Sequence, residues 1–237
     1  MGGYNAERTN ERTNERTLPP IFVISLKHSS RREFISARLL SLGLSFEFFD
    51  AVYGKNLSQA ELDKIDFEFS LKYGFKKPMT LGEIGCAMSH IKLYEYIATN
   101  KIDKAIILED DAIVSLDFED IVKEALKKVP KSMEILFLDH GKAKIFPFTR
   151  RLPERYRLAR YLTPSKYSKR AVFKATGYLI TLSGIKKLLD QAYPIRMQAD
   201  LLTGLLQLTG IKAYGIEPPC VFGSNDSEID KIENRYE

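Results

Sequence analysis

The chain has 237 residues, of which 44% are hydrophobic and 28% are charged, and its formal net charge is +5. These values are ordinary for a soluble globular protein and exclude a fibrous or fully disordered chain. A chain of this length predicts a single α/β domain. Because there is no apolar run of about 18 residues and no apolar signal-peptide core, we expect the protein to be cytoplasmic. The two cysteines, Cys86 and Cys220, fit a reducing compartment and do not have zinc-site spacing.

Residues 1–18 contain the tetrapeptide Asn-Glu-Arg-Thr in tandem. The repeat has no apolar face to bury, so we expect this tail to be disordered, and residues 226–237 to form a second polar tail. Repeated copies of the tetranucleotide AACG would encode the same tetrapeptide. Such tracts slip during replication, which leads to the hypothesis that the gene is phase-variable, like many bacterial genes for surface structures. The alternative is a charged tail without a function.

The first predicted elements are a strand, a helix and a second strand. The pattern favours a buried strand at residues 21–26, a helix over residues 31–42 that Ser29 caps, and a strand at residues 46–52. This order indicates a βαβ unit with parallel strands. No glycine-rich phosphate loop follows the first strand, so neither a Rossmann dinucleotide site nor a P-loop NTPase is supported. The helix is expected to bury an apolar face made of Phe34, Ile35, Ala37, Leu39 and Leu40.

An apolar strand at residues 105–108 is followed by three consecutive acids, Glu109, Asp110 and Asp111. The short apolar run suits a strand buried on both faces of a parallel sheet. Ligands bind at the carboxyl ends of such strands, and adjacent carboxylates there favour a divalent cation. Because side chains alternate along an extended segment, we expect Glu109 and Asp111 to clamp Mg²⁺ or Mn²⁺ and Asp110 to point away. The alternative is a solvated turn after a core strand.

A long helix is predicted over residues 81–99. Thr80 and Glu83 have the spacing of a capping box, and apolar residues surround the first turns of the helix. Cys86 and His90 lie on the same side of this helix as Glu83. His90 is therefore either a binding residue or a hydrogen-bonded core histidine.

Further candidate residues lie in the second half of the chain. A strand over residues 133–139 ends in Asp139 and His140, which adds a second strand end with potential metal ligands. Asp200 precedes an apolar helix at residues 201–208, where it is either a helix N-cap or a catalytic acid. The remaining predicted elements are strands at residues 175–181 and 214–221 and a helix over residues 182–192.

The basic residues are concentrated in one segment. Residues 142–174 contain eleven Lys or Arg and a single acid, Glu154, which gives this segment a net charge of +10 against −5 for the rest of the chain. Aromatic residues are interleaved with these charges. Such a surface suits nucleic acid, a phosphorylated glycolipid or an anionic membrane, and composition leaves these alternatives open.

Several sequence blocks together resemble glycosyltransferase family 25, which includes lipopolysaccharide and lipooligosaccharide glycosyltransferases and collagen galactosyltransferases. The resemblance covers about residues 20 to 225. This family often has Pro-x-Asp where the chain has Gln198-Ala199-Asp200. The matching blocks are IFVISLKHSSRR (residues 21–32), FFDAVYGK (48–55), LGEIGCAMSHI (81–91), IILEDDA (106–112) and the segment 175–189 with Gly177-Tyr178.

The resemblance implies an α/β, GT-A-like nucleotide-sugar transferase fold, with a mostly parallel central sheet flanked by helices, as one domain over residues 19–225. It implies the inverting transfer of a hexose, usually galactose from UDP-galactose, with UDP-glucose as the alternative donor. The acidic motif would hold the ribose and a Mn²⁺ or Mg²⁺ ion that bridges the diphosphate. The donor-binding residues expected are Leu26, Ser29, Arg32, Asp50, Ala51, Glu83, His90, Glu109 and Asp110.

The metal ligands expected are Glu109, Asp111 and His140. Inversion requires a base that takes the proton of the acceptor hydroxyl, and Asp200 is the first candidate and Asp139 the second. The basic segment would face the phosphorylated lipooligosaccharide core or the inner face of the bacterial cytoplasmic membrane, and not nucleic acid. The residues expected on this acceptor- and membrane-facing surface are Arg150, Arg151, Arg155, Arg157 and Arg160.

Three other functions stay open at this point. A nucleic-acid-binding protein would use the basic segment but leaves the acidic strand end unexplained. A metal-dependent phosphoryl-transfer enzyme would use the same acids, yet the sequence has no recognisable phosphate loop. An inactive sugar-binding module would keep the fold and tolerate Asp111→Asn.

Overall fold

The computed structural model describes residues 17–74, 76–141 and 143–224. The prediction of a disordered tail at residues 1–18 falls outside these ranges except for its last two residues. The predicted polar tail at residues 226–237 and the basic residue Lys142 also lie outside them.

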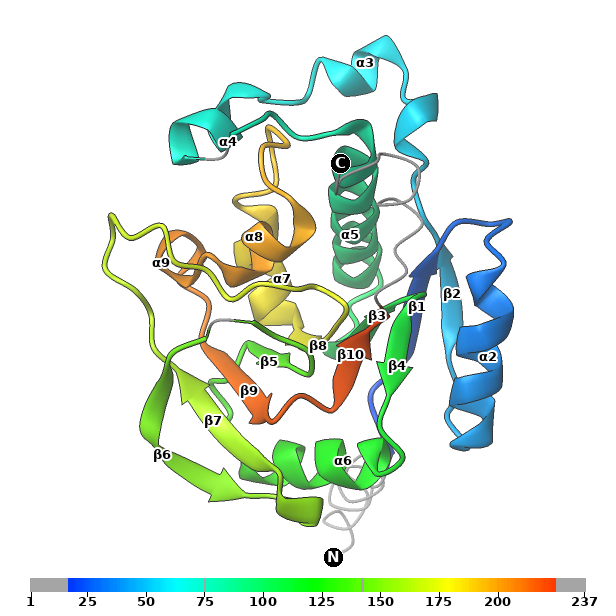
Figure 1. Cartoon of the computed structure of the whole chain (residues 1–237), viewed down its shortest axis with the longest axis vertical. Helices are drawn as coiled ribbons and strands as arrows, with labels where there is room; N and C mark the ends of the chain where they lie inside the picture. Colours follow the sequence, from blue (N-terminus) through cyan, green and yellow to red (C-terminus); the bar gives the residue numbers. More distant parts are fainter. Residues whose placement is uncertain (1–16, 75, 142, 225–237) are drawn as a thin grey trace, which may run out of the picture.

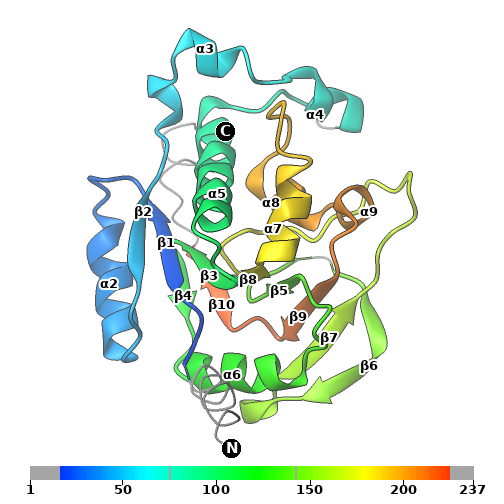
Figure 2. The same cartoon turned by 180° about the vertical axis from the view of Figure 1, so that it is seen from behind.

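An eight-stranded sheet forms the centre of the structure (Figures 1 and 2). In spatial order its strands are β2 (Glu47–Asp50), β1 (Ile21–Ser25), β3 (Lys104–Glu109), β8 (Gly177–Thr181), β5 (Ile135–Phe137), β9 (Ala213–Glu217), β7 (Arg157–Tyr161) and β6 (Ile145–Arg151). β1 is parallel to β2 and β3, and β5 is parallel to β9. β8 is antiparallel to both of its neighbours, β3 and β5, and the β6–β7 hairpin forms one edge of the sheet.

Helices cover both faces of this sheet. On one face lie α2 (Arg31–Ser41) and α6 (Phe118–Lys128), and on the other lie α5 (Leu81–Thr99), α7 (Leu182–Leu189), α8 (Ala199–Gly204) and α9 (Leu206–Thr209). Ile106 and Leu108 of β3 pack into the first layer, and Ala105 and Ile107 into the second. The apolar run of β3 is therefore buried on both sides, and the predicted α/β class is confirmed.

The connection from β2 to α5 extends beyond the sheet, beside the start of α5 (Figure 1). It contains the short helices η1 (Gly54–Asn56), α3 (Gln59–Leu62) and α4 (Glu68–Tyr73). A second, two-stranded antiparallel sheet pairs β4 (Ala112–Val114) with β10 (Val221–Gly223). β4 directly follows the acidic triplet in the chain.

The start of α5 has the predicted capping box. The Thr80 hydroxyl accepts a hydrogen bond from the Glu83 N–H (3.2 Å), and the Glu83 carboxylate accepts one from the Thr80 N–H (2.8 Å). These two bonds satisfy donors that a helix N-terminus otherwise leaves free. The first turn of α5 is thereby fixed in position.

The apolar face predicted for α2 is narrower in the structure. Ile35 and Leu39 are buried, whereas Phe34 is 76% exposed and Leu40 is 66% exposed. The expectation that Phe34 and Leu40 pack against the sheet was wrong, because only one stripe of this outer helix faces β1 and β4.

The predicted N-cap of α2 was wrong, and one of the two interpretations of Asp200 is excluded. The N-cap of α2 is Ser30, although the Ser29 hydroxyl accepts a hydrogen bond from the Arg31 N–H (3.2 Å). The N-cap of α8 is Gln198, and Asp200 already lies in the first turn of that helix. Asp200 therefore does not have the capping role that was one of its two interpretations.

Two elements expected to be continuous are divided. The apolar segment at residues 201–208 belongs to α8 and α9, which meet at Leu205. The strand expected at residues 214–221 becomes β9 and β10, since Pro218-Pro219 interrupts it, and proline cannot donate a ladder hydrogen bond.

Candidate active site

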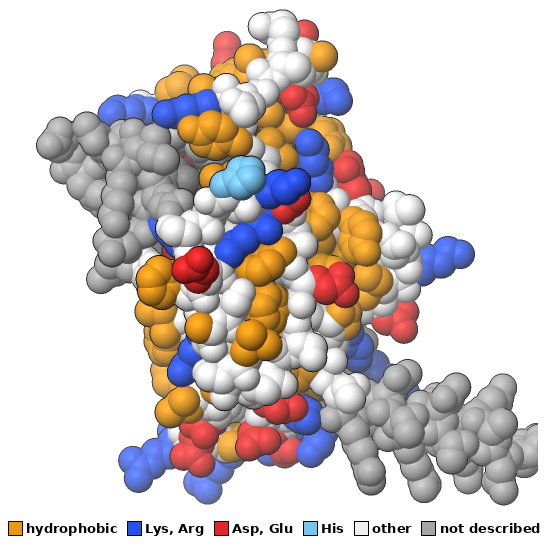
Figure 3. Space-filling model, turned by 90° about the vertical axis from the view of Figure 1, so that its right-hand side faces the viewer, with side chains coloured by type: hydrophobic (Ala, Val, Ile, Leu, Met, Phe, Trp, Pro, Cys, Tyr) orange, Lys and Arg blue, Asp and Glu red, His pale blue; other side chains and the backbone are white. Residues whose placement is uncertain are grey.

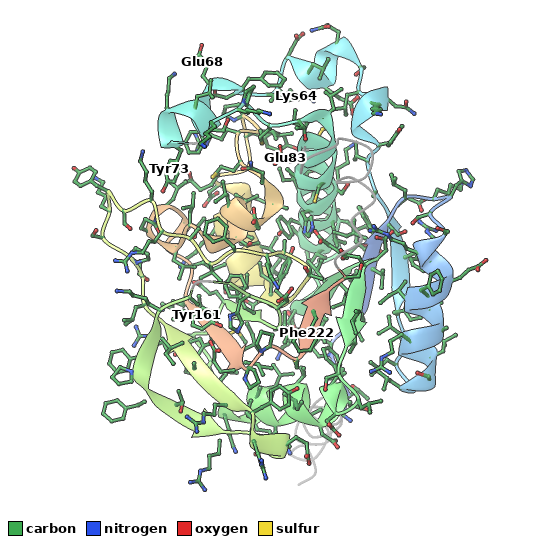
Figure 4. The ribbon with its side chains drawn as sticks, viewed as in Figure 1. Lys64, Glu68, Tyr73, Glu83, Tyr161 and Phe222 are labelled. Carbon is green, nitrogen blue, oxygen red and sulfur yellow. The ribbon has the colours of Figure 1, made fainter. Side chains whose placement is uncertain are left out.

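A cavity of about 500 Å³ opens at the carboxyl ends of β1 and β3. These strand ends, residues 51–55 and the first turns of α5 form one part of its wall, and residues 173–176 and 198–201 form another. Glu83 belongs to this lining and lies at the upper end of α5 in Figure 4. Ligands of open α/β sheets bind at this edge.

The loop at residues 51–55 lies very close to α5. A Cβ atom on Gly85 would be 2.7 Å from the backbone atoms Gly54 N and Val52 O, and a Cβ on Gly54 would be 1.7 Å from Leu81 O. Both positions therefore need glycine for the close approach of two backbones. The two glycines fix the distance between the loop and the helix that line the cavity.

The three consecutive acids at the end of β3, Glu109, Asp110 and Asp111, all line the cavity. Asp110 accepts hydrogen bonds from the Ser25 hydroxyl (2.7 Å) and the Arg31 guanidinium (3.4 Å). Glu109 instead contacts Cys86 and His90, so these two neighbouring acids have different partners. The chain turns after Glu109 and does not continue as the extended segment on which the expected alternation of side chains was based.

Asp111 has an unusual environment. Its Oδ1 atom is buried and has no hydrogen-bond partner among the residues that the structure describes. Burial, reinforced by the charge of Glu109, raises the pKa of the Asp111 carboxyl to about 7, and Arg31 acts in the opposite direction. An orphaned carboxylate oxygen beside a cavity is an environment that a divalent cation satisfies.

A series of buried, hydrogen-bonded side chains contacts Glu109. His90 is fully buried, and its Nε2 atom lies 3.3 Å from Glu109 Oε1. On the other side of the ring, Nδ1 lies 2.7 Å from the Tyr178 hydroxyl, which lies 2.5 Å from the Tyr94 hydroxyl. His90 is therefore a hydrogen-bonded core histidine that orients Glu109, and it does not line the cavity.

Asp200 lines the cavity, and Asp139 does not. Asp200 Oδ2 accepts a hydrogen bond from the Lys174 N–H (3.4 Å), and burial raises the pKa of the Asp200 carboxyl. Asp139 is fully buried, and its Oδ1 lies 3.1 Å from the ammonium group of Lys174. Of the two candidates for the base, only Asp200 lines the cavity.

His140 is also outside the cavity lining. Its Nε2 lies 3.0 Å from the carbonyl oxygen of Ile216 and 3.4 Å from Glu217 Oε1, both on β9. The expectation that His140 binds a metal together with Glu109 and Asp111 is therefore not supported, because its Nε2 atom already contacts two residues of β9.

The predicted donor-binding residues divide into two groups. Arg32 lies behind the wall, where its guanidinium donates to the carbonyl of Ser25 and to the carboxylate of Asp50. The residues that line the cavity are Leu26, Ala51, Glu83, Glu109 and Asp110. Those that do not line it are Ser29, Arg32, Asp50 and His90.

The polar lining residues to which the sequence assigned no role include Lys55 and Gln198. Lys55 stands in the block at residues 48–55, so the resemblance itself could have indicated it, whereas Gln198 had no comparable signal.

The five arginines predicted to face the acceptor or a membrane are exposed, but they do not line the cavity. They lie on the β6–β7 hairpin and on the short helix η2 (Pro153–Arg155) that joins its strands. Phe148 of the same hairpin is 82% exposed. At the opposite edge of the sheet, the visible face with α2 intermixes acidic, basic and apolar side chains (Figure 3).

Residues 18–203 match the family model described as glycosyltransferase family 25 (LPS biosynthesis protein). The chain belongs to glycosyltransferase family 25. This membership confirms the resemblance that the sequence blocks indicated.

The curated relatives of this family 25 chain are much longer proteins. It is 33% identical over 181 residues to procollagen galactosyltransferase 1-B of Xenopus laevis, covering 72% of this chain and 28% of that protein. It is 32% identical to a glycosyltransferase 25 family member of Aedes aegypti (72% and 28% covered), and 25% identical to a probable inactive member of Bos taurus (74% and 29%). The chain thus spans less than a third of their length.

Solved structures show weaker likeness. A mannose-1-phosphate geranyltransferase from Thermus thermophilus gives a TM-score of 0.39 at 11% identity, with 84% of this chain and 73% of that chain covered. A glycosyltransferase involved in glycosylation of the major capsid of PBCV-1 gives 0.35 at 8% identity, with 91% and 98% covered. Within the described residues, no helix has the length and apolar character needed to span a membrane.

Proposed function

We propose that this family 25 chain is an inverting glycosyltransferase that moves galactose from UDP-galactose onto the growing lipooligosaccharide or lipopolysaccharide core. The observation that carries the proposal is the set of three neighbouring acids at the end of β3, which line a cavity at the ligand-binding edge of the sheet. The names of the procollagen galactosyltransferases support galactose, and the description of the family model supports the lipopolysaccharide pathway. UDP-glucose is the alternative donor.

The residues of the cavity fit a Mn²⁺ or Mg²⁺ ion held by Glu109 and Asp111. Their carboxylate oxygens are the ligands that such hard ions prefer, and Asp111 Oδ1 has no other partner among the described residues. When bound, the ion supplies Lewis-acid stabilisation of the departing diphosphate. Arg31 and Lys55 add positive charge to the same cavity.

In the proposed reaction Asp200 is the general base. It takes the proton of the acceptor hydroxyl as that oxygen attacks the sugar, a contribution of about 10² to 10⁴ in rate. The place of Asp200 in the cavity lining supports this role. Asp139, the second candidate, is separated from the cavity and already compensated by Lys174.

The proposed acceptor and membrane surface is the β6–β7 hairpin. Its exposed arginines would bind phosphate groups of the lipooligosaccharide core or of anionic lipids, and Phe148 would enter the lipid interface. The protein would then be peripheral on the inner face of the bacterial cytoplasmic membrane, without nucleic acid as a partner.

The test is hydrolysis and binding of a panel of UDP-sugars, measured with and without Mn²⁺, with Asp111→Asn as the control. We expect UDP-galactose to raise the melting temperature and to be hydrolysed only with the ion present. Strong salt-dependent DNA binding without any UDP-sugar binding would favour the nucleic-acid alternative instead. Full activity of Asp111→Asn would contradict the proposed role of this carboxylate.

A further inference from the structure

Three side chains that can bind a metal lie close together, those of Cys86, His90 and Glu109, and two of these residues, Cys86 and Glu109, line the cavity. Cys86 and His90 are four residues apart on α5 and share one side of it, and Glu109 ends the neighbouring strand β3. Glu109 Oε1 lies 3.6 Å from Cys86 Sγ and 3.3 Å from His90 Nε2. Ligand atoms of all three residues lie within 4.8 Å of one another.

The two separations from Glu109 match those between neighbouring ligands of a tetrahedral zinc ion, and the pair Cys86 and His90 lies within 4.8 Å. Zinc binds sulfur at about 2.3 Å and nitrogen or oxygen at about 2.0–2.2 Å, so adjacent ligand atoms are roughly 3.3–3.7 Å apart. Cys86 and Glu109 line the cavity, which leaves a fourth coordination position open on that side. A thiolate and an imidazole select thiophilic ions over Mg²⁺.

The surroundings of His90 also suit a ligand. Metal-binding histidines are held by a hydrogen bond through their other ring nitrogen, which fixes the orientation of the ring. The Tyr178 hydroxyl provides this bond at Nδ1, and the Tyr94 hydroxyl holds Tyr178. Nε2 is thereby directed at the space shared by Cys86 and Glu109.

We propose that Cys86, His90 and Glu109 form a binding site for a thiophilic divalent cation such as Zn²⁺, which shares Glu109 with the Mn²⁺ or Mg²⁺ position at Glu109 and Asp111. On binding, the S–H bond of Cys86 breaks, a sulfur–metal bond forms and the proton passes to solvent. Because Glu109 would belong to both sites, occupancy withdraws it from the donor site and inhibits transfer. This inhibition rests on the proposed function, whereas the site itself does not.

The site is tested by titrating the full chain with Co²⁺ as a spectroscopic probe. Thiolate coordination gives a near-ultraviolet charge-transfer band, and tetrahedral geometry gives intense visible bands. We expect one equivalent of Co²⁺ to produce both in the unaltered chain and in Cys220→Ser, a matched control because Cys220 is buried outside the cavity. Cys86→Ser should lose the charge-transfer band while keeping its melting temperature. Absence of the band in the unaltered chain, or its survival in Cys86→Ser, overturns the proposal.

The inhibition is tested separately. Zn²⁺ is added to the UDP-sugar reaction at saturating Mn²⁺, and each variant is compared with its own rate before addition. We expect Zn²⁺ to inhibit the unaltered chain and Cys220→Ser but not Cys86→Ser. A chain that gives the cobalt bands but hydrolyses no UDP-sugar would refute the proposed function and leave the cation site intact. Equal inhibition of all three proteins would refute the inhibitory role.

Discussion

The backbone N–H of Lys174 donates to Asp200 Oδ2 (3.4 Å), while the ammonium group of the same lysine lies 3.1 Å from Asp139 Oδ1. Lys174 has a φ of 78°, a left-handed conformation that costs on the order of 1–3 kcal/mol outside glycine. This conformation allows one residue to hold two carboxylates in different environments. Asp200 lies at the cavity wall, and Asp139 lies inside the protein.

The first prediction compares these two acids. Asp200→Asn should lower kcat by about 10² to 10⁴ with little change in the KM for the UDP-sugar, because the base acts on the acceptor. Asp139→Asn should mainly lower the melting temperature, since it removes the partner of the Lys174 ammonium group. Steady-state kinetics and thermal denaturation of both variants measure the difference. A folded Asp139→Asn protein with the larger loss of kcat would reverse the assignment of the base.

The second prediction concerns the pH dependence of Asp111. Its pKa is raised from an ordinary value near 4 to about 7, so between these values the folded protein holds a proton that the unfolded chain releases. The free energy of unfolding therefore falls as the pH rises from about 4 to about 7. In Asp111→Asn this fall in the free energy of unfolding is absent, because asparagine does not titrate. Without divalent ions, the variant should melt above the unaltered chain at pH 8, and the difference should shrink toward pH 4.

The same variant tests the role of Asp111 with the metal. We expect Mn²⁺ to raise the melting temperature of the unaltered chain at pH 8 and to have no such effect on Asp111→Asn, because an ion that binds only the folded protein stabilises it. Transfer activity should be abolished. An equal Mn²⁺ effect on both proteins would place the ion elsewhere.

The third prediction uses the close approach of α5 and the loop at residues 51–55. Gly85→Ala should displace this loop, since the new methyl group would meet Gly54 N and Val52 O at 2.7 Å. We expect a loss of about 1–3 kcal/mol in stability and an increased KM for the UDP-sugar. Gly43→Ala is the control, because Gly43 has a φ of +70° and no atom near its Cβ position. It should lose roughly 1–2 kcal/mol without a change in KM.

The fourth prediction concerns the β6–β7 hairpin. Phe148→Ser combined with Arg151→Ser should weaken binding to vesicles that contain anionic lipids, because each basic residue near such a surface contributes about 1 kcal/mol. Phe34→Ser is the control for loss of an exposed aromatic side chain, since Phe34 is also exposed (76%) but lies on α2, near the opposite edge of the sheet. Vesicle co-sedimentation measures the effect. An equal loss in both proteins would mean that the hairpin is not the membrane-binding surface.

Local patterns predicted those features that depend on neighbouring residues. The capping box of α5 needs only Thr80 and Glu83, and the burial of β3 needs only its own apolar run. The shared side of Cys86 and His90 also follows from helical spacing alone. These features were therefore readable from the sequence.

Features that depend on tertiary arrangement were not readable. The position of α2 on the outside of the sheet leaves Phe34 exposed. A contact with the Ile216 carbonyl of β9 keeps the His140 ring away from the cavity. The turn after Glu109 brought Asp110 into the same cavity as its neighbours. Each case depends on a partner that is distant in sequence, so no local periodicity could reveal it.

The reversed direction of β8 has a consequence for how such enzymes could diversify. Because β8 is antiparallel to β3, its first residue, Gly177, pairs with Leu108 near the end of β3, and residues 173–176 must emerge beside the acids. The first half of the chain thus builds one half-site, and the second half builds the other. Recombination within residues 112–172 would exchange one half-site and retain the other, so that one wall of the cavity could change while the acids at the end of β3 are kept.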